Sequence, residues 1–265
     1  MHIMSGELLP QPYTVLSDAV SVWQQGNMLA GDTYIGTNPE GWEQNLETAL
    51  ANLAKFTTAS RVLRLSAAGQ TVDLIDMDRA PQPSTLLQPL RTEGVITSNP
   101  AHVLFANPAD CGEIAVSGVA NDDRPVIGLF HASRQQVDRK SYLRSLEYLC
   151  VSRGIEVEDL SLRLSPSARA ESYVFRDIDD AQRTSSRWEG YVKYCGGDGL
   201  WRVDFHNLMR DDLRAFGIKD EQVWVSPDDT AHPDSPYFSY SQSVSKLVKH
   251  NKPDGGNGLL LALRS

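Results

Sequence analysis

Apolar residues recur at helical spacing in three segments of the chain. In residues 40–54, 140–153 and 203–216 the apolar side chains lie three or four positions apart, while polar residues occupy the other face. Gly154 and Gly217 directly follow the second and third segments, where a glycine commonly ends a helix. The pattern therefore predicts three helices, each with one apolar face.

Short runs of β-branched and apolar residues, bounded by turn residues, predict strands between and around these helices. The runs lie at 61–65, 71–76, 94–97, 103–106, 114–119, 125–130, 160–164, 173–175, 223–225 and 259–263. The turn residues Asn121, Asp122 and Asp123 join two runs and predict a β-hairpin. The first 40 residues show little periodicity, so we expect short strands and loops there.

The order of these elements indicates the fold class. Strands occur both as neighbouring runs and between helices, which favours an α/β (α+β) layered sandwich, with mixed β-sheets inside and helices outside, over a strictly alternating doubly wound fold. The glycine-rich runs at 196–199 and 255–258 lack the spacing of a phosphate-binding loop and predict hairpin turns or loops. No repeat or break in composition divides the chain, so we expect a single domain over residues 1–265.

Composition and charge exclude several classes of partner. The chain is 41% hydrophobic and 22% charged, as in ordinary globular proteins, and its net charge of -9 opposes binding to nucleic acid. The most basic stretch, residues 246–252, has too few charges to neutralise many phosphates. No apolar run approaches the roughly 18 residues of a membrane span, and the N-terminus lacks signal-peptide order. We expect a cytoplasmic protein that binds neither membrane nor nucleic acid.

Cysteine and histidine supply the candidate chemistry. Cys111 follows a predicted strand and the turn at 107–110, and His131 ends the next predicted hairpin strand, so a hairpin would bring them to one end of a sheet. A thiol beside an imidazole can act as a nucleophile or share a zinc ion. The same residues can equally be a buried cysteine and a hydrogen-bonded histidine. Asp110 either orients the pair or holds the turn.

Other polar residues carry weaker signals. The three cysteines are widely spaced, which favours single thiols in a reducing compartment over disulfides or structural zinc. Ser239 lies among the aromatic residues of 237–240 and could line a pocket for a planar ligand, although such clusters more often pack. The remaining histidines show no metal-ligand spacing, and the chain lacks the elbow motif of serine hydrolases.

Three short motifs together resemble those of YfiH-like, or laccase-domain, proteins. They are Glu93-Gly-Val-Ile-Thr97, Ala109-Asp-Cys111 and Phe130-His-Ala132, and their order and spacing are typical of the family. Similar segments at 164–167, 173–174, 203–207 and 237–240 extend the resemblance to roughly residues 28–263. The resemblance implies a layered α/β fold and a zinc-associated enzyme that acts on purine nucleosides by phosphorolysis or adenosine deamination. Older descriptions of the family speak of polyphenol oxidases.

The chain departs from this family at several motif positions. A histidine that precedes a glycine in the family, and that the resemblance implies as a zinc ligand beside Cys111 and His131, is replaced by Ala68. Two protein ligands are fewer than catalytic zinc sites normally use, so we do not expect tight zinc binding. Residues 133–136 replace the family's glycine-tryptophan-arginine-glycine, although Arg134, shifted by one position, could contact phosphate. Further departures are Asn257 in place of an arginine and Ser226-Pro227 in place of cysteine-threonine.

Two hypotheses follow from these observations. In the first, the chain is a divergent purine-nucleoside enzyme, by phosphorolysis or deamination, in which Cys111 and His131 are catalytic, Asp110 orients them, and nucleoside and phosphate are the small-molecule partners. In the second, it is a catalytically eroded paralogue that acts as a binding or assembly protein. Copper-dependent phenol oxidation ranks last, because the chain shows no clusters of copper ligands. The pattern makes no prediction of oligomeric state.

Overall fold

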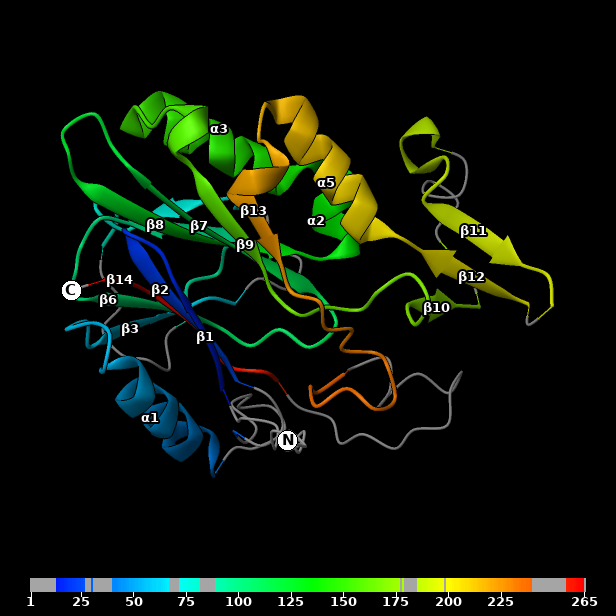
Figure 1. Cartoon of the computed structure of the whole chain (residues 1–265), viewed down its shortest axis with the longest axis horizontal. Coiled ribbons are helices and arrows are strands. Elements are labelled where there is room, and N and C mark those ends of the chain that lie inside the picture. Colours follow the sequence, from blue (N-terminus) through cyan, green and yellow to red (C-terminus); the bar gives the residue numbers. More distant parts are fainter. Residues whose placement is uncertain are drawn as a thin grey trace, which may run out of the picture.

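Two stacked β-sheets form the centre of the computed structural model, with helices on both outer faces (Figure 1). The structure describes residues 13–26, 30, 40–66, 72–81, 89–176, 178, 185–197, 199–239 and 256–264. Ala68 and the basic stretch at 246–252 lie outside the described residues.

The first sheet has six strands in the order β13-β9-β7-β8-β5-β4 and carries the residues of interest for function. Its strands are β4 (Ile75–Asp76), β5 (Gly94–Thr97), β7 (Gly112–Val119), β8 (Pro125–Ala132), β9 (Ser161–Leu164) and β13 (Val223–Val225). The β7 and β8 strands form the predicted hairpin, and its turn places Asp123 at a φ of 61°. Parallel pairs at both edges, β4 with β5 and β13 with β9, make the sheet mixed.

The second sheet has five strands in the order β1-β2-β14-β6-β3. Its strands are β1 (Tyr13–Ser17), β2 (Ser21–Gly26), β3 (Arg61–Arg64), β6 (His102–Ala106) and β14 (Leu259–Leu263). The C-terminal strand β14 lies between β2 and β6 and pairs antiparallel with both. The first two strands, β1 and β2, and the last strand, β14, therefore belong to one sheet.

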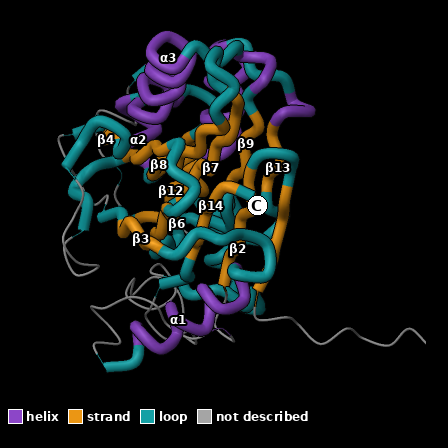
Figure 2. The backbone as a smooth tube through the Cα atoms, turned by 90° about the vertical axis from the view of Figure 1, so that its left-hand side faces the viewer, coloured by secondary structure: helices purple, strands orange, loops and turns teal. Residues whose placement is uncertain are grey.

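Alternating side chains of these strands fill three apolar layers. In β14, Leu259, Leu261 and Leu263 face the other sheet, whereas Leu260 and Ala262 face helix α1 (Trp42–Leu53). The layer on the far side of the six-stranded sheet packs against α2 (Arg134–Arg139), α3 (Ser141–Arg153) and α5 (Phe205–Phe216). Figure 2 shows α1 and α3 at opposite ends of this stack. The layered sandwich with mixed sheets inside and helices outside is therefore confirmed.

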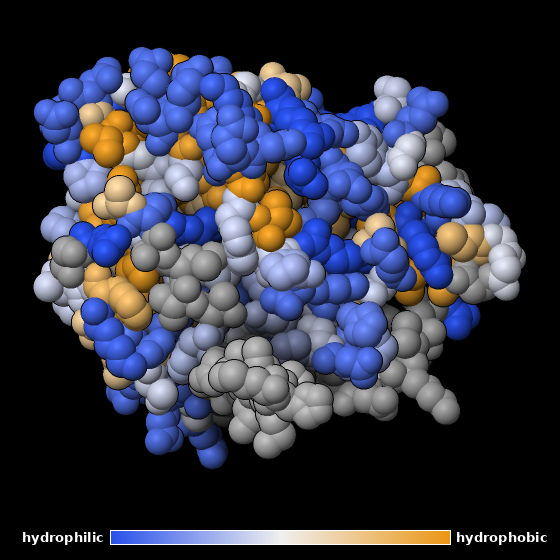
Figure 3. Space-filling model, viewed as in Figure 1, coloured by the Kyte–Doolittle hydropathy of each residue, from blue (hydrophilic) through white to orange (hydrophobic). Residues whose placement is uncertain are grey.

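The helix ends follow local capping rules. The α3 helix stops at Gly154, whose φ of 64° suits a glycine, and α5 stops at Gly217 with a φ of 106°. The Asp204 side chain caps the start of α5 by accepting a hydrogen bond from the Asn207 N–H at 3.0 Å. The outer surface over α3 and α5 is mostly hydrophilic (Figure 3).

A small third sheet projects beside this stack, in the order β10-β12-β11 (Figure 1). Its strands are β10 (Val174–Phe175), β11 (Val192–Cys195) and β12 (Leu200–Val203). Single 3-10 turns occur at η2 (Val157–Asp159), η3 (Ser186–Trp188) and η4 (Asp220–Gln222). The β12 strand corrects the predicted third helix, because Val203 ends this strand and the helix begins only at Phe205. No helix among the described residues is long and apolar enough to cross a membrane.

Candidate active site

The β7–β8 hairpin brings the candidate thiol and imidazole together. Cys111 immediately precedes β7, and the strand register places Gly112 opposite Ala132 and Glu113 opposite His131. Cys111 lies close enough to His131 to help raise the pKa of the imidazole. His131 lies within β8 and not at its end as predicted, because the strand continues to Ala132. The two residues therefore lie at the same open end of the hairpin.

Glu113 is the third member of this group, and the sequence analysis did not identify it. Its Oε1 lies 2.7 Å from Nδ1 of His131, and its side chain is only 2% exposed. The backbone of Glu113 is held by Ser165, whose Oγ accepts from the Glu113 N–H and whose N–H donates to the Glu113 carbonyl. A signal existed in the sequence, because a glutamate in an otherwise apolar strand must find a partner when it is buried.

The electrostatic environment favours a charged imidazole. Burial acts to lower the pKa of His131, but the charge of Glu113, together with hydrogen bonds from Cys111 and Glu113, outweighs it and holds that pKa well above its usual value. Burial also raises the pKa of Glu113, although His131 opposes this shift. Burial thus dominates at the carboxyl, whereas the interactions with Glu113 and Cys111 together outweigh burial at the imidazole, so both pKa values are raised.

An aromatic and cationic group lies next to the thiol. Burial raises the pKa of Tyr173 above its usual value, the charge of Cys111 raises it further, and Arg134 acts against the shift. The ring of Phe175 contacts Tyr173 at 4.7 Å between centroids, and the Arg134 guanidinium lies 4.5 Å from the centroid of Phe175. Nη1 of Arg134 is buried and has no hydrogen-bond partner in the part of the chain that the structure describes. Arg134 is thus able to receive an anionic group.

A second buried histidine lies close to this group. His206 of α5 contacts the hydroxyl of Ser167 through Nε2 and Nη1 of Arg169 through Nδ1, the latter at 3.2 Å. Ser167 itself lies next to Gly112, because a Cβ on that glycine would be 3.7 Å from the Ser167 hydroxyl. Burial and the charge of Arg169 lower the pKa of His206 to about 3. This imidazole is therefore neutral across the physiological range.

Comparison with known families assigns the fold and the lineage. The family model described as multi-copper polyphenol oxidoreductase laccase matches residues 23–247. The chain belongs to this laccase family. A comparison with curated proteins yields no match.

Three solved structures of similar proteins share the laccase-family fold. YlmD from Geobacillus stearothermophilus superposes with a TM-score of 0.74 at 15% identity, covering 97% of this chain and 100% of that one. The hypothetical protein YfiH of Bacillus licheniformis gives 0.72 at 15% identity, and a Neisseria meningitidis protein of the DUF152 family gives 0.69 at 14%. Both comparisons cover 96% of this chain and 100% of the other. The resemblance to YfiH-like proteins is confirmed.

The metals implied by the laccase family do not fit the described residues. Among them, no group of three histidine, cysteine or acidic side chains could hold a metal ion. Cys111 and His131 supply two donors, and Nδ1 of His131 is already bound to Glu113. A catalytic zinc site normally takes three protein ligands, and copper sites also use several. We therefore assign no step to a metal.

The other predicted site residues have mainly structural contacts. Asp110 is 5% exposed, and its Oδ1 accepts a hydrogen bond from Thr230 at 2.9 Å. Ser239 is fully buried next to Phe238. The Asn257 side chain accepts a hydrogen bond from the Phe238 N–H and donates one to the Pro108 carbonyl, which links Phe238 to the loop before Cys111. Asn257, one of the predicted departures from the family motifs, thus closes this loop. The orienting role of Asp110 and ligand contact by Ser239 stay predictions.

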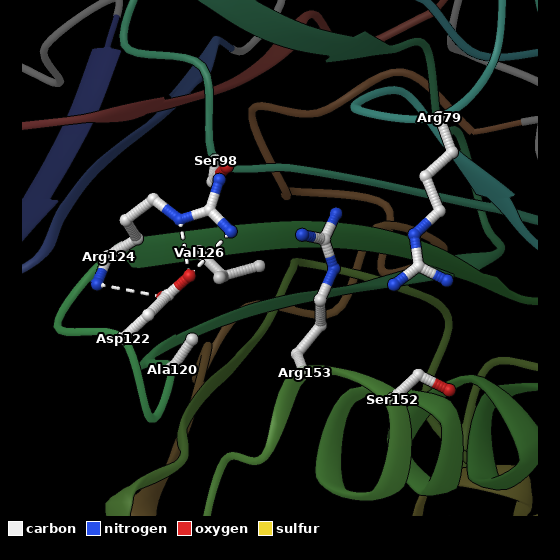
Figure 4. Close-up of a pocket in the computed structure, with 8 residues that line it drawn as sticks. All are labelled: Arg79, Ser98, Ala120, Asp122, Arg124, Val126, Ser152 and Arg153. Atoms are coloured by element: carbon white, nitrogen blue, oxygen red, sulfur yellow. Dashed lines mark hydrogen bonds and ion pairs between the residues drawn. The ribbon is translucent and has the colours of Figure 1, made fainter.

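A polar cavity of about 90 Å³ lies at the other end of the hairpin, around its β7–β8 turn (Figure 4). The arginines that line it are Arg79, Arg124 and Arg153. The aspartates that form ion pairs with them are Asp76, Asp78 and Asp122. These charges cancel, so the cavity has no excess charge with which to attract an anion.

Proposed function

We propose that the chain is a purine-nucleoside enzyme that removes an amino group by hydrolysis, with Cys111 as nucleophile and His131 as proton carrier. The nearness of Cys111 to His131, which follows from the pairing of β7 with β8 and from the effect of Cys111 on the pKa of His131, supports this assignment. A thiol held against an imidazole is the usual arrangement for nucleophilic catalysis by cysteine. The nucleoside substrate class rests on the resemblance to YfiH-like proteins.

The chemistry of a thiol favours deamination over phosphorolysis. The Cys111 sulfur adds to the ring carbon that bears the amino group, and His131 gives a proton to the amine, which leaves as ammonia. His131 then takes a proton from water, the resulting hydroxide adds to the same carbon, and the thiolate leaves. The net reaction consumes one water and releases one ammonia. Phosphorolysis would use phosphate as the nucleophile and give the sulfur no bond to form.

Arg134 and Tyr173 would shape the binding site around this carbon. In the proposal, the buried Nη1 of Arg134 donates hydrogen bonds to an anionic group, such as a phosphate carried by or accompanying the nucleoside. Zinc is not required, in agreement with the two available donors. Three free cysteines suit the reducing conditions of the cytoplasm, which we propose as the location.

An ammonia-release assay with adenosine tests this function. We expect the purified protein to form inosine and ammonia at the same rate with and without phosphate, and with and without a metal chelator. Cys111→Ser should lose this activity, because a hydroxyl is a far weaker nucleophile than a thiolate. Cys150→Ser is the matched control and should retain it, because Cys150 lies on α3, outside the proposed site.

The other outcomes separate the remaining hypotheses. Release of the free base that depends on phosphate would replace deamination by phosphorolysis. If no purine nucleoside reacts and none raises the melting temperature, the chain is the non-enzymatic paralogue. Full activity in Cys111→Ser would remove the thiol from the mechanism.

A further inference from the structure

The two nitrogens of the His131 ring face two different partners. Nδ1 contacts Oε1 of Glu113 at 2.7 Å, which leaves Nε2 as the nitrogen available to Cys111. An ionised carboxylate only accepts hydrogen bonds, so Nδ1 must carry a proton as long as Glu113 is charged. The contact therefore fixes both the tautomer and the orientation of the ring.

The contact is held rigidly from both sides. Glu113 and His131 are directly opposite each other in the β7–β8 ladder. Ser165 of the loop after β9 fixes the Glu113 backbone with two hydrogen bonds, and the His131 N–H donates to the Glu93 carbonyl at 2.7 Å. Neither partner can move far without breaking sheet hydrogen bonds. Such a framework holds a catalytic side chain in a defined position.

A carboxylate at this position is costly unless it has a function. Glu113 is 2% exposed, and its Oε2 is buried with no hydrogen-bond partner within the described ranges. A buried, half-satisfied carboxylate costs folding free energy that the isosteric amide of glutamine would largely avoid. Packing alone therefore does not explain a glutamate here.

We propose that Glu113 is the positioning residue of the Cys111–His131 pair, which makes a metal-independent Cys-His-Glu triad. The inference rests on the proposed role of Cys111 as nucleophile. Glu113 presents Nε2 of His131 to the sulfur, as the buried carboxylate of a hydrolase triad orients its imidazole. In this chain Glu113, and not a metal ion, orients the imidazole of His131.

The neighbouring charged groups do not replace Glu113 in this role. Besides Cys111, the charged groups that shift the pKa of Tyr173 are Asp110 and Arg134. Asp110 directs its Oδ1 to Thr230, and the Arg134 guanidinium lies over the ring of Phe175. Among the described residues, Glu113 is the carboxylate hydrogen-bonded to His131.

Alkylation of Cys111 by iodoacetamide tests the inference without any substrate. The rate at Cys111 is followed by peptide mass spectrometry in a Cys150→Ser, Cys195→Ser background. We expect Glu113→Gln to lower this rate about tenfold or more at neutral pH, because the amide no longer enforces a proton on Nδ1. Glu113→Asp should recover part of the rate, because it keeps an acceptor-only group. Glu147→Gln, on the exposed face of α3, removes one carboxylate elsewhere and should leave the rate unchanged.

Nitrogen NMR of His131 distinguishes positioning from packing. When the ring is titrated to its neutral form, Nδ1 should keep the proton in the wild type, whereas the neutral ring of Glu113→Gln should show a mixture of tautomers, with an unchanged fold by circular dichroism. An unchanged alkylation rate and an unchanged tautomer in Glu113→Gln would overturn the inference. Protection of Cys111 from alkylation by stoichiometric zinc would also overturn it, because a metal would then hold the pair.

This experiment is independent of the adenosine assay. If adenosine does not react but the alkylation rate still depends on Glu113, the triad is supported and only the proposed substrate is contradicted. If wild-type Cys111 reacts no faster than a free thiol in an unfolded peptide, the nucleophile itself is lost, and the triad with it.

Discussion

The two buried histidines of this protein have similar surroundings and opposite electrostatics. His131 lies near Cys111, and His206 contacts the hydroxyl of Ser167, so each imidazole has a potential nucleophile beside it. The difference is the charged residue on Nδ1. A glutamate accepts from His131, whereas Arg169 donates to His206.

The sign of that neighbouring charge decides what each imidazole can do. Arg169 donates to Nδ1 of His206, so the proton of the neutral ring must be on Nε2, which then donates to Ser167 and cannot take a proton from it. The pKa of about 3 keeps this ring in the neutral state. Contact between a serine and a histidine is therefore no sign of catalysis by itself.

The largest expected effect is on catalytic activity, which should depend on one of the two histidine centres, Cys111 with His131, and not on the other, Ser167 with His206. Cys111→Ala should reduce adenosine deamination about 10³-fold or more, as loss of the nucleophile does in hydrolases that use a triad. Ser167→Ala should change kcat by less than about threefold, because His206 cannot activate the serine. Both values come from the ammonia-release assay, with circular dichroism to check folding. A large loss of kcat in Ser167→Ala alone would reverse the assignment of the two centres.

The next effect is the dependence of stability on pH. The pKa of His206 is about 3 in the folded state, below the usual 6.5 of a free imidazole, so between these values the unfolded chain binds a proton that the folded chain does not. This contribution to stability is complete above the unfolded pKa and is lost as pH falls toward 3. Between about pH 6.5 and about pH 5 the loss is about 2 kcal/mol. His131 has the opposite sign, because its raised pKa stabilises the folded state at low pH.

Urea denaturation of the wild type and His206→Gln isolates this contribution. The difference in unfolding free energy between the two proteins should narrow by about 2 kcal/mol over that range of pH. Above about pH 7 the difference should be constant, which serves as the internal control. A difference that stays constant down to about pH 5 would show that burial and the charge of Arg169 do not hold His206 neutral.

The sequence predicts the layers of the fold better than the site. Strands 94–97, 223–225 and 259–263 are continuous, mainly apolar runs, and each has the predicted bounds. The α2 helix was not predicted, because it is six residues long and its residues are mostly polar. The β11 and β12 strands were not predicted either, since their burial is mixed and gives no clear pattern.

The site depends on information that periodicity does not carry. Placing Cys111 near His131 required only a hairpin, which the turn residues indicate. Finding Glu113 required the exact pairing of β7 with β8, because a shift by one residue would move its side chain to the other face of the sheet. The partners of His206, which are Ser167 and Arg169, come from the loop after β9, far from α5 in the sequence, so no local pattern could reveal them.

The smallest expected effect concerns the link between the two centres. The Thr230 hydroxyl donates to Asp110, next to Cys111, and the Thr230 N–H donates to the carbonyl of Ser167, which contacts His206. Thr230→Val keeps the shape but removes the hydroxyl donor, which should cost about 1 kcal/mol of stability, measured by urea denaturation. If Asp110 serves only to hold this loop, the alkylation rate of Cys111 should stay within about twofold of the wild type. A drop as large as that expected for Glu113→Gln would instead show that Asp110 orients the thiol, and the two histidine centres would then act as one site.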